Sequence, residues 1–282
     1  MGNNGSGFDI AKLRVEPGSK VKLARIDPSS TPSWKADEGL ADKEQAAAKL
    51  AELAQRLTAL QSMLWAQSKE RLLVVLQAMD AGGKDGTIRR VFEGVNPSGV
   101  RVASFKKPTE PELARDYLWR IHQQVPANGE LVIFNRSHYE DVLVVRVMDL
   151  VPEDRWRCRY RHIVEFERML ADEGTTIVKL FLHISREEQR ERLQARLSEP
   201  DKNWKFDEAD LVPRARWDDY QQAFEEAITQ TSTEQAPWYI VPANRKWYRN
   251  LAVSEILVKT LEGLKMSYPP APPDIADLVI PE

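Results

Sequence analysis

A lysine that directly follows two glycines marks the part of this sequence best suited to chemistry, within AMDAGGKDGTI at 78–88. Glycines permit a tight turn, and the first backbone N–H groups of a helix that starts after the turn are free to bind an anion. The ammonium group of Lys84 adds a point charge. We therefore predict a phosphate-binding loop around Lys84, formed by Ala81, Gly82, Gly83, Asp85, Gly86 and Thr87.

This loop departs twice from the usual phosphate-loop pattern, G-x-x-x-x-G-K-[ST]. Ala78 stands at the first glycine, and Asp85 stands where a Ser or Thr hydroxyl would bind Mg²⁺. Mg²⁺ prefers oxygen ligands and retains several waters, so we expect the carboxylate of Asp80 to replace that hydroxyl. The alternative is a tight strand-to-helix connection that binds no ligand.

A second polar segment, NRSHYED at 135–141, follows a short apolar run that we predict to be a strand. Ligands of open α/β sheets bind at the carboxyl ends of the strands. Phosphate-loop enzymes usually have an Asp here for Mg²⁺, whereas this chain has Asn135, whose neutral oxygen suits a supporting metal role. Asn135 is otherwise a hydrogen-bonding turn residue. The guanidinium group of Arg136 can bind phosphate oxygens through two parallel N–H donors.

Strands and helices alternate along the predicted chain, which is the pattern of βαβ units. Short apolar runs predict the strands, and apolar periodicity or helix caps predict the helices between them. We therefore expect an α/β fold with a mostly parallel, five-stranded sheet and right-handed crossovers. The predicted strands are 72–76, 100–105, 131–134, 176–184 and 238–241, and the predicted helices are 42–67, 87–92, 111–124, 155–173, 185–197, 217–229 and 249–264.

The composition is that of an ordinary globular protein, with 282 residues, 40 basic and 43 acidic side chains, and a formal charge of -3. This balance does not favour nucleic acid as a partner. One cysteine excludes an internal disulfide and fits a reducing compartment, so we predict the cytoplasm. No apolar stretch approaches the roughly 18 residues that span a bilayer, so we expect no membrane partner. The amphipathic helix over 42–67 is suited to packing or to an oligomer contact, and we expect a homo-oligomer.

Four stretches together resemble one family, the type-2 polyphosphate kinases: AMDAGGKDGTI at 78–88, FNRSHYEDVLVVRV at 134–147, PDKNWKF at 200–206 and APWYIVPANRKWYRNLAV at 236–253. The resemblance extends from about Arg14 to Leu264 and is far more specific than a lone Gly-Lys match. Asn135 and the HYED that follows look like the subclass that phosphorylates both AMP and ADP. The resemblance implies a thymidylate-kinase-like, three-layer α/β/α fold and Mg²⁺-assisted phosphoryl transfer between inorganic polyphosphate and adenine nucleotides.

The resemblance also implies roles for single residues. Asp80 and Lys84 match the family's phosphate-loop acid and base, and Arg136 matches the arginine after its second motif. We take these three residues as the candidate catalytic residues, and Asp80 and Asn135 as the candidate metal ligands. We expect nucleotide contacts from Lys106, Asn135, Tyr139 and Glu140, and polyphosphate contacts from Arg196, Lys202 and Lys205.

A polyphosphate chain carries about one charge per unit, so its groove needs a row of basic side chains, and binding should weaken steeply with salt. The Arg-rich helix at 186–196 and the lysines after it are suited to form this row. The alternative is a solvated helix face on which the arginines pair with glutamates at i,i+4 spacing. Lys106 is likewise either a phosphate contact or a solvated loop residue. No general base is required, because the acceptor phosphate is already an anion at neutral pH.

We divide the chain into an irregular arm at 1–40, a phosphate-loop kinase domain at 41–266 with a mobile lid at about 198–216, and an extended tail at 267–282. Pro and Ser without periodicity mark the arm, and closely spaced prolines mark the tail. Two other functions stay open from the sequence. One is a nucleoside monophosphate kinase that uses ATP as its donor, and the other is a regulatory module that binds nucleotide and signals through a change of shape.

Overall fold

Five parallel strands form a single sheet in the order β2-β3-β1-β4-β5. The computed structural model that shows this describes residues 8–35, 42–208 and 211–273, together with 275, 278, 280 and 281. The central strand pairs with neighbours on both sides and is buried along almost its whole length, which is why it reads as a continuous apolar run. The strands are β1 (Arg71–Ala78), β2 (Val100–Ser104), β3 (Leu131–Asn135), β4 (Thr175–His183) and β5 (Trp238–Pro242).

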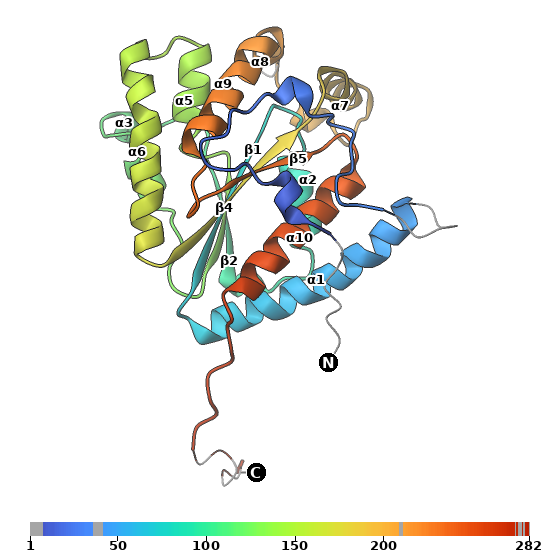
Figure 1. The fold of residues 1–282 in the computed structure, drawn as a ribbon, viewed down its shortest axis with the longest axis vertical. Coiled ribbons are helices and arrows are strands. Elements are labelled where there is room, and N and C mark those ends of the chain that lie inside the picture. Colours follow the sequence, from blue (N-terminus) through green and yellow to red (C-terminus); the bar gives the residue numbers. More distant parts are fainter. Residues whose placement is uncertain are drawn as a thin grey trace.

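Helices cover both faces of this sheet and give three layers (Figure 1). On one side, α1 (Asp42–Gln67) packs along α10 (Lys246–Gly263), which also contacts α2 (Lys84–Val91). On the other side, α5 (Glu140–Val147), α6 (Glu153–Asp172) and α9 (Trp217–Thr231) pack against one another. The remaining helices are α3 (Glu110–Leu113), α4 (Trp119–His122), α7 (Arg186–Ser198) and α8 (Leu211–Ala215). The predicted α/β class and five-stranded sheet are confirmed.

The apolar stripe of α1 is used inside the chain. Leu53, Leu57, Leu60 and Leu64 recur at helical spacing, and each of them is at most 4% exposed. They belong to the same hydrophobic core as the apolar residues of α10, against which α1 packs. This stripe therefore gives no support to the homo-oligomer that we expected from it.

The predicted helix over 111–124 is wrong in one respect, because two short helices replace it. A capping box between Thr109 and Glu112 begins α3. Further along, the carboxylate of Asp116 accepts the N–H of Leu118 at 3.0 Å, and the carbonyl of Asp116 accepts the N–H of Trp119 at 3.1 Å. An Asp side chain that binds nearby backbone N–H groups in this way competes with helix continuation, so the chain turns before α4 begins.

Part of the arm, which the structure describes over residues 8–35, lies along β5 at the edge of the sheet. The N–H of Val15 donates to the carbonyl of Trp238 at 2.8 Å, and Arg14 forms an antiparallel bridge with Tyr239. Apolar side chains of the arm, such as Leu23 at 1% exposure, join the main core. The arm thus covers part of an edge that would otherwise present unpaired backbone groups.

The proposed divisions of the chain stay predictions at their boundaries. The predicted arm at 1–40, the lid at about 198–216 and the tail at 267–282 each include positions outside the described residues. Within the described part of the lid, a short 3₁₀ turn at Asn203–Lys205 and helix α8 interrupt the irregular chain. No helix among the described residues has the length and apolar character needed to cross a membrane.

Candidate active site

The phosphate loop joins the end of β1 to the start of α2 through a left-handed turn. Gly83 is the N-cap of α2 with a φ of 101°, and Ala81 has a φ of 58°. A Cβ atom at Gly82 would lie 2.5 Å from the Cβ of Ala78, so this position needs glycine for space. The turn places the first backbone N–H groups of α2 beside the carboxyl end of β1, where an anion can accept them.

Lys84 is the first residue of α2, and its side chain returns toward the end of β1. Its Nζ donates to the carbonyl oxygen of Ala78 at 3.1 Å, which leaves further ammonium protons for a ligand. Burial lowers the pKa of Lys84, while the carboxylate of Asp80 acts in the opposite direction. Thr87 does not present its hydroxyl to a ligand, because it is 1% exposed and donates to the carbonyl of Gly83 at 3.0 Å.

Asp80 and Arg136 form an ion pair between the phosphate loop and the residue after β3. Arg136 Nη2 donates to Asp80 Oδ1 at 2.8 Å, and their side chains are 41% and 18% exposed, respectively. Arg136 has a φ of 63°, and its N–H donates to the carbonyl of Leu76 at 3.2 Å. The structure therefore brings the three candidate catalytic residues, Asp80, Lys84 and Arg136, together at the carboxyl end of β1.

Asn135 and Asp85 connect the end of β3 to the first turn of α2. The amide Nδ2 of Asn135 donates to Asp85 Oδ1 at 2.7 Å. The amide group is thus used as a donor within the protein, and its oxygen is the only end of it that could act as a metal ligand. The chain has Asp85 where the usual phosphate loop has Ser or Thr, and Asn135 where phosphate-loop enzymes usually have Asp. These two departures fit together, because the two side chains form one hydrogen bond.

Replacing Asn135 with Asp is expected to destabilise the protein when no divalent cation is present. The change removes the donor to Asp85 and places a second carboxylate at hydrogen-bond distance, at a cost of about 1–3 kcal/mol. Thermal unfolding of Asn135→Asp in EDTA and in Mg²⁺ measures the effect, and Mg²⁺ should restore more stability to this variant than to the wild type. Asn135→Ala is the control, because it loses the bond without adding charge; equal melting temperatures of the two variants in EDTA would contradict the repulsion.

Glu140, at the start of α5, lies close to the same ion pair. Its carboxylate is 4.0 Å from Arg136 Nη1, and its side chain is 17% exposed. Burial raises the pKa of Glu140, whereas the nearby positive charges of Arg136 and Lys84 lower it and a hydrogen bond from Gln77 stabilises the charged form. Glu140 is therefore placed where a ligand bound beside Arg136 would meet it.

Tyr139 faces the core, so the structure gives no support to the nucleotide contact that we predicted for it. Its side chain is fully buried, and its hydroxyl hydrogen-bonds with Glu167, Lys179 and Thr231 at 2.9 Å in each case. The short segment after β3 turns into α5 at Tyr139, so neighbouring side chains point to opposite sides. Arg136 and Glu140 face the loop, while Tyr139 faces the core between the sheet and α6.

The other predicted contact residues lie in the connection after β2 and in the helix and lid that follow β4. Lys106 is exposed in the connection after β2, and its carbonyl accepts Arg120 Nη1 at 2.9 Å. In the lid, Lys202 forms an ion pair with Glu199, and the carbonyl of Arg196 accepts Asn203 Nδ2 at 2.7 Å. The side chain of Lys205 lies outside the described part of the structure. The roles of these residues stay predictions.

Comparison with known proteins decides the family. Residues 40–269 match the family model described as Polyphosphate kinase 2. This chain belongs to the polyphosphate kinase 2 family. An AMP/ADP-polyphosphate phosphotransferase from Meiothermus ruber is 65% identical over 260 residues, which are 92% of this chain and 96% of that protein. An ADP-polyphosphate phosphotransferase from Rhodopseudomonas palustris is 44% identical over 274 residues, or 93% of each chain.

Solved structures agree with this family. A crystal structure of polyphosphate kinase 2 from Arthrobacter aurescens TC1 superposes with a TM-score of 0.91 at 44% identity, covering 97% of this chain and 96% of that one. A putative polyphosphate kinase 2 from Pseudomonas aeruginosa PA01 gives a TM-score of 0.78 at 32% identity, covering 86% of this chain and 50% of that one. The predicted phosphate-loop kinase fold is therefore confirmed for this polyphosphate kinase 2 family member.

Sequence reasoning did not identify two residues that hold the phosphate loop of this polyphosphate kinase 2 family member. Gln189 Nε2 donates to the carbonyl of Asp80 at 3.0 Å, and Arg192 Nη1 donates to the carbonyl of Ala81 at 3.1 Å. Both come from α7, more than a hundred residues along the chain. The Arg-rich character of α7 was visible in the sequence, but nothing there indicated which of its arginines reach the loop.

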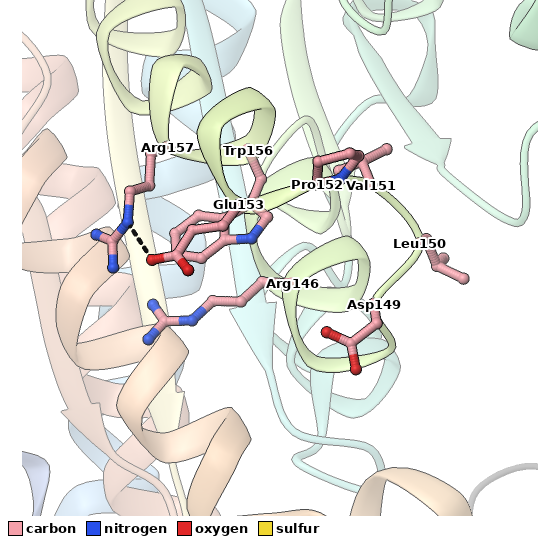
Figure 2. A pocket seen from close by; sticks show the side chains of 8 residues that line it. All are labelled: Arg146, Asp149, Leu150, Val151, Pro152, Glu153, Trp156 and Arg157. Atoms are coloured by element: carbon pink, nitrogen blue, oxygen red, sulfur yellow. Dashed lines mark hydrogen bonds and ion pairs between the residues drawn. The ribbon is translucent and has the colours of Figure 1, made fainter.

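A separate concavity of about 540 Å³ lies where α5 connects to α6 (Figure 2). Its lining includes Arg146 and Arg157, whose guanidinium groups each lie 4.7 Å from the ring of Trp156. Both arginines are also paired with Glu226, at 2.6 Å and 3.0 Å. Because these charges already have protein partners, and none of the candidate catalytic residues lines the concavity, we do not assign it to the kinase site.

The donor set at the phosphate loop fits a magnesium ion rather than a transition metal. Among the described residues, no group of three or more His, Cys, Asp or Glu side chains is arranged to hold a metal. Mg²⁺ commonly binds through one or two carboxylates, with waters and substrate phosphates as its other ligands. The carboxylate of Asp80, just after β1, and the amide oxygen of Asn135, at the end of the neighbouring strand β3, suit that mode.

Proposed function

We propose that this protein transfers phosphoryl groups between inorganic polyphosphate and AMP or ADP, forming ADP and ATP in a reversible reaction. The observation that supports it most is the meeting of Lys84, Asp80 and Arg136 at the phosphate loop of a chain that is 65% identical to an AMP/ADP-polyphosphate phosphotransferase over 260 residues. Other relatives are named for ADP or for AMP alone. Use of both nucleotides is thus the finer part of the proposal.

The residues of this site suit phosphoryl transfer without a nucleophilic side chain. Charge in the transition state spreads over the equatorial oxygens of the transferred group, so the protein mainly has to position the reactants and neutralise charge. The ammonium of Lys84 and the guanidinium of Arg136 approach the loop from α2 and from the end of β3, respectively. The acceptor phosphate is already an anion, so no general base has to remove a proton.

We further propose Mg²⁺ as the cofactor, held by Asp80 with support from Asn135. When bound, it would neutralise negative charge on the phosphate oxygens of both substrates. Asp80 would then exchange its hydrogen bond with Arg136 for a metal contact, which frees that guanidinium for phosphate.

A cytoplasmic location and a homo-oligomeric state also stay proposals. Light scattering of the purified protein tests the oligomeric state.

Replacing Asp80 with Asn is expected to lower turnover by about a hundredfold and to raise the Mg²⁺ concentration that gives half the maximal rate. The amide keeps the size of the side chain but removes the charge that would bind the cation. Initial rates measured across a Mg²⁺ titration test this. Asp201→Asn, a change of the same kind at an exposed lid position, is the control; an unchanged Mg²⁺ dependence in Asp80→Asn would remove Asp80 from the metal site.

The decisive experiment mixes the protein with AMP, Mg²⁺ and polyphosphate and omits ATP. Formation of ADP, followed by ATP, is the expected result. A protein that makes ADP from AMP only when ATP is supplied would be a nucleoside monophosphate kinase instead. A protein that binds nucleotide but gives no turnover with either donor would be a regulatory module.

A further inference from the structure

Arg249, on the first turns of α10, is a buried guanidinium group with unused hydrogen-bonding capacity. Its side chain is 4% exposed. Its Nε and Nη2 both donate to Oδ1 of the adjacent Asn250, at 3.1 Å and 2.8 Å. Within the described residues, no carboxylate pairs with Arg249 and no acceptor binds its Nη1. A buried arginine without an anionic partner is rare, because removing the charge from water is not repaid.

The guanidinium of Arg249 lies directly against the phosphate loop. A Cβ atom at Gly83 would be 2.2 Å from Arg249 Nη1, and a Cβ atom at Gly86 would be 3.6 Å from Nη2. The lack of a side chain at Gly83 therefore makes room for the arginine, whereas a Cβ atom at Gly86 would only be in ordinary contact with it. The unpaired Nη1 thus lies at the start of α2, where the backbone N–H groups of the loop also favour an anion.

A second arginine strengthens the positive charge on this side of the loop. Arg192 Nη1 would lie 3.3 Å from a Cβ atom at Gly83 and donates to the carbonyl of Ala81. Arg192 has a carboxylate partner, because its Nε donates to Glu188 at 2.7 Å. Burial, with a further contribution from Arg192, lowers the pKa of Arg249 to about 10. Among the described residues, only one of these two neighbouring guanidinium groups, that of Arg192, has a carboxylate partner.

We propose that Arg249 binds an oxygen of the phosphate chain held in the phosphate loop, donating through Nη1 from the α10 side. The identity of that chain rests on the proposed function: it is polyphosphate or the phosphates of a nucleotide. Arg136 approaches the loop from β3, is partly exposed and is already paired with Asp80. Among the described residues Arg249 has no carboxylate partner to release before it binds a ligand, so we expect its loss to be seen directly in a raised Kd.

Direct titration of the full-length protein with tripolyphosphate and, separately, with ADP tests this proposal. Both titrations use the same fixed Mg²⁺ concentration. Arg249→Met is expected to raise Kd for at least one ligand by about tenfold to a hundredfold, because a charge-assisted hydrogen bond is lost. Arg249→Lys keeps the positive charge but not the planar guanidinium group, so its Kd should rise less than that of Arg249→Met. Arg56→Met removes an exposed arginine from α1 and is the control, with Kd within about twofold of the wild type.

The two ligands identify which phosphate chain Arg249 contacts. A raised Kd for tripolyphosphate alone assigns the contact to polyphosphate, and a raised Kd for ADP alone assigns it to the nucleotide. Melting temperatures measured without ligand separate binding from a structural role. If Arg249 only supports the fold, Arg249→Met should melt at a lower temperature than the wild type, and both of its Kd values should be unchanged. That result overturns the proposal. If Arg249→Met does not fold, Arg249→Lys takes its place in the test. Kd values of Arg249→Lys within twofold of the wild type for both ligands would then overturn the proposal.

The outcome is separable from that of the proposed function. A wild-type protein that binds tripolyphosphate in an Arg249-dependent way but forms no ADP from AMP would refute the proposed function and leave the anion contact in place. A wild-type protein that forms ADP, with both Arg249 variants binding both ligands normally, would refute the contact alone.

Discussion

Replacing Lys84 with Met is expected to lower the rate of phosphoryl transfer by about a hundredfold to a thousandfold without destabilising the protein. The ammonium of Lys84 is held at the phosphate loop by a hydrogen bond to the carbonyl of Ala78 at 3.1 Å. Met has a similar length and packs in the same space, but it carries no charge and donates no hydrogen bond. Initial rates with AMP, polyphosphate and Mg²⁺ measure the loss.

The stability of this variant depends on pH with a defined sign. Burial lowers the pKa of Lys84 below its ordinary value of 10.5, so the folded protein binds this proton less tightly than the unfolded chain does. Below the folded-state pKa, the buried charge of Lys84 lowers the free energy of unfolding by its full amount. This destabilisation is lost as the pH rises from the folded-state pKa toward 10.5. Lys84→Met should therefore melt no lower than the wild type at pH 7, and any advantage should shrink as the pH is raised.

Lys12→Met is a suitable control, because Lys12 is exposed on the arm and far in sequence from the loop. It should leave both the rate and the melting temperature within experimental error. A Lys84→Met protein with more than about a tenth of the wild-type rate would contradict the role of this ammonium in neutralising phosphate charge.

The largest expected change in stability comes from Lys179, at the centre of a buried polar cluster between β4 and α6. Its three ammonium protons are all used, by Glu167 Oε2 at 2.6 Å, the carbonyl of Thr231 at 2.6 Å and the Tyr139 hydroxyl at 2.9 Å. Glu167 also accepts from Tyr139 and lies 3.1 Å from His138 Nε2. Burial would raise the pKa of Glu167, but the Lys179 charge, with His138, lowers it overall.

Replacing Lys179 with Met should lower the free energy of unfolding by about 3–5 kcal/mol, because it leaves the carboxylate of Glu167 buried without its main counter-charge. Urea denaturation at neutral pH measures this loss. Lys49→Met is a matched control: Lys49 pairs with Glu52 at 2.8 Å on the surface of α1, and that change should cost less than about 1 kcal/mol.

A second substitution separates the ion pair from simple packing. The double variant Lys179→Met with Glu167→Leu removes both charges, so it should recover most of the stability that the single variant loses. Strict additivity of the two single changes would show that the buried charges do not depend on each other. Because His138 and Tyr139 lie only two and three residues after Arg136 in sequence, the single variant should also lower turnover by disturbing the turn that carries Arg136.

The phosphate loop could be predicted from sequence because its conformation is set within a few residues. Gly82 and Gly83 are required by close approach and by a positive φ, and Lys84 begins the helix that follows. The strands were predictable for a similar reason, since strands buried on both faces are short apolar runs. One local interaction was not predicted. The side chain of Asp116 accepts a backbone hydrogen bond from Leu118 and so interrupts the helix predicted over 111–124.

The sequence by itself thus determined the family, the five parallel strands and the two segments, 78–88 and 135–141, that meet at the site. Only the tertiary structure decided which side chains of those segments face the loop, as Glu140 does, and which face the core, as Tyr139 does. It also brought Gln189 and Arg249 to the loop from distant helices. Residue pattern fixes backbone conformation over short distances, whereas such contacts depend on the order of strands in the sheet and on how helices pack across it.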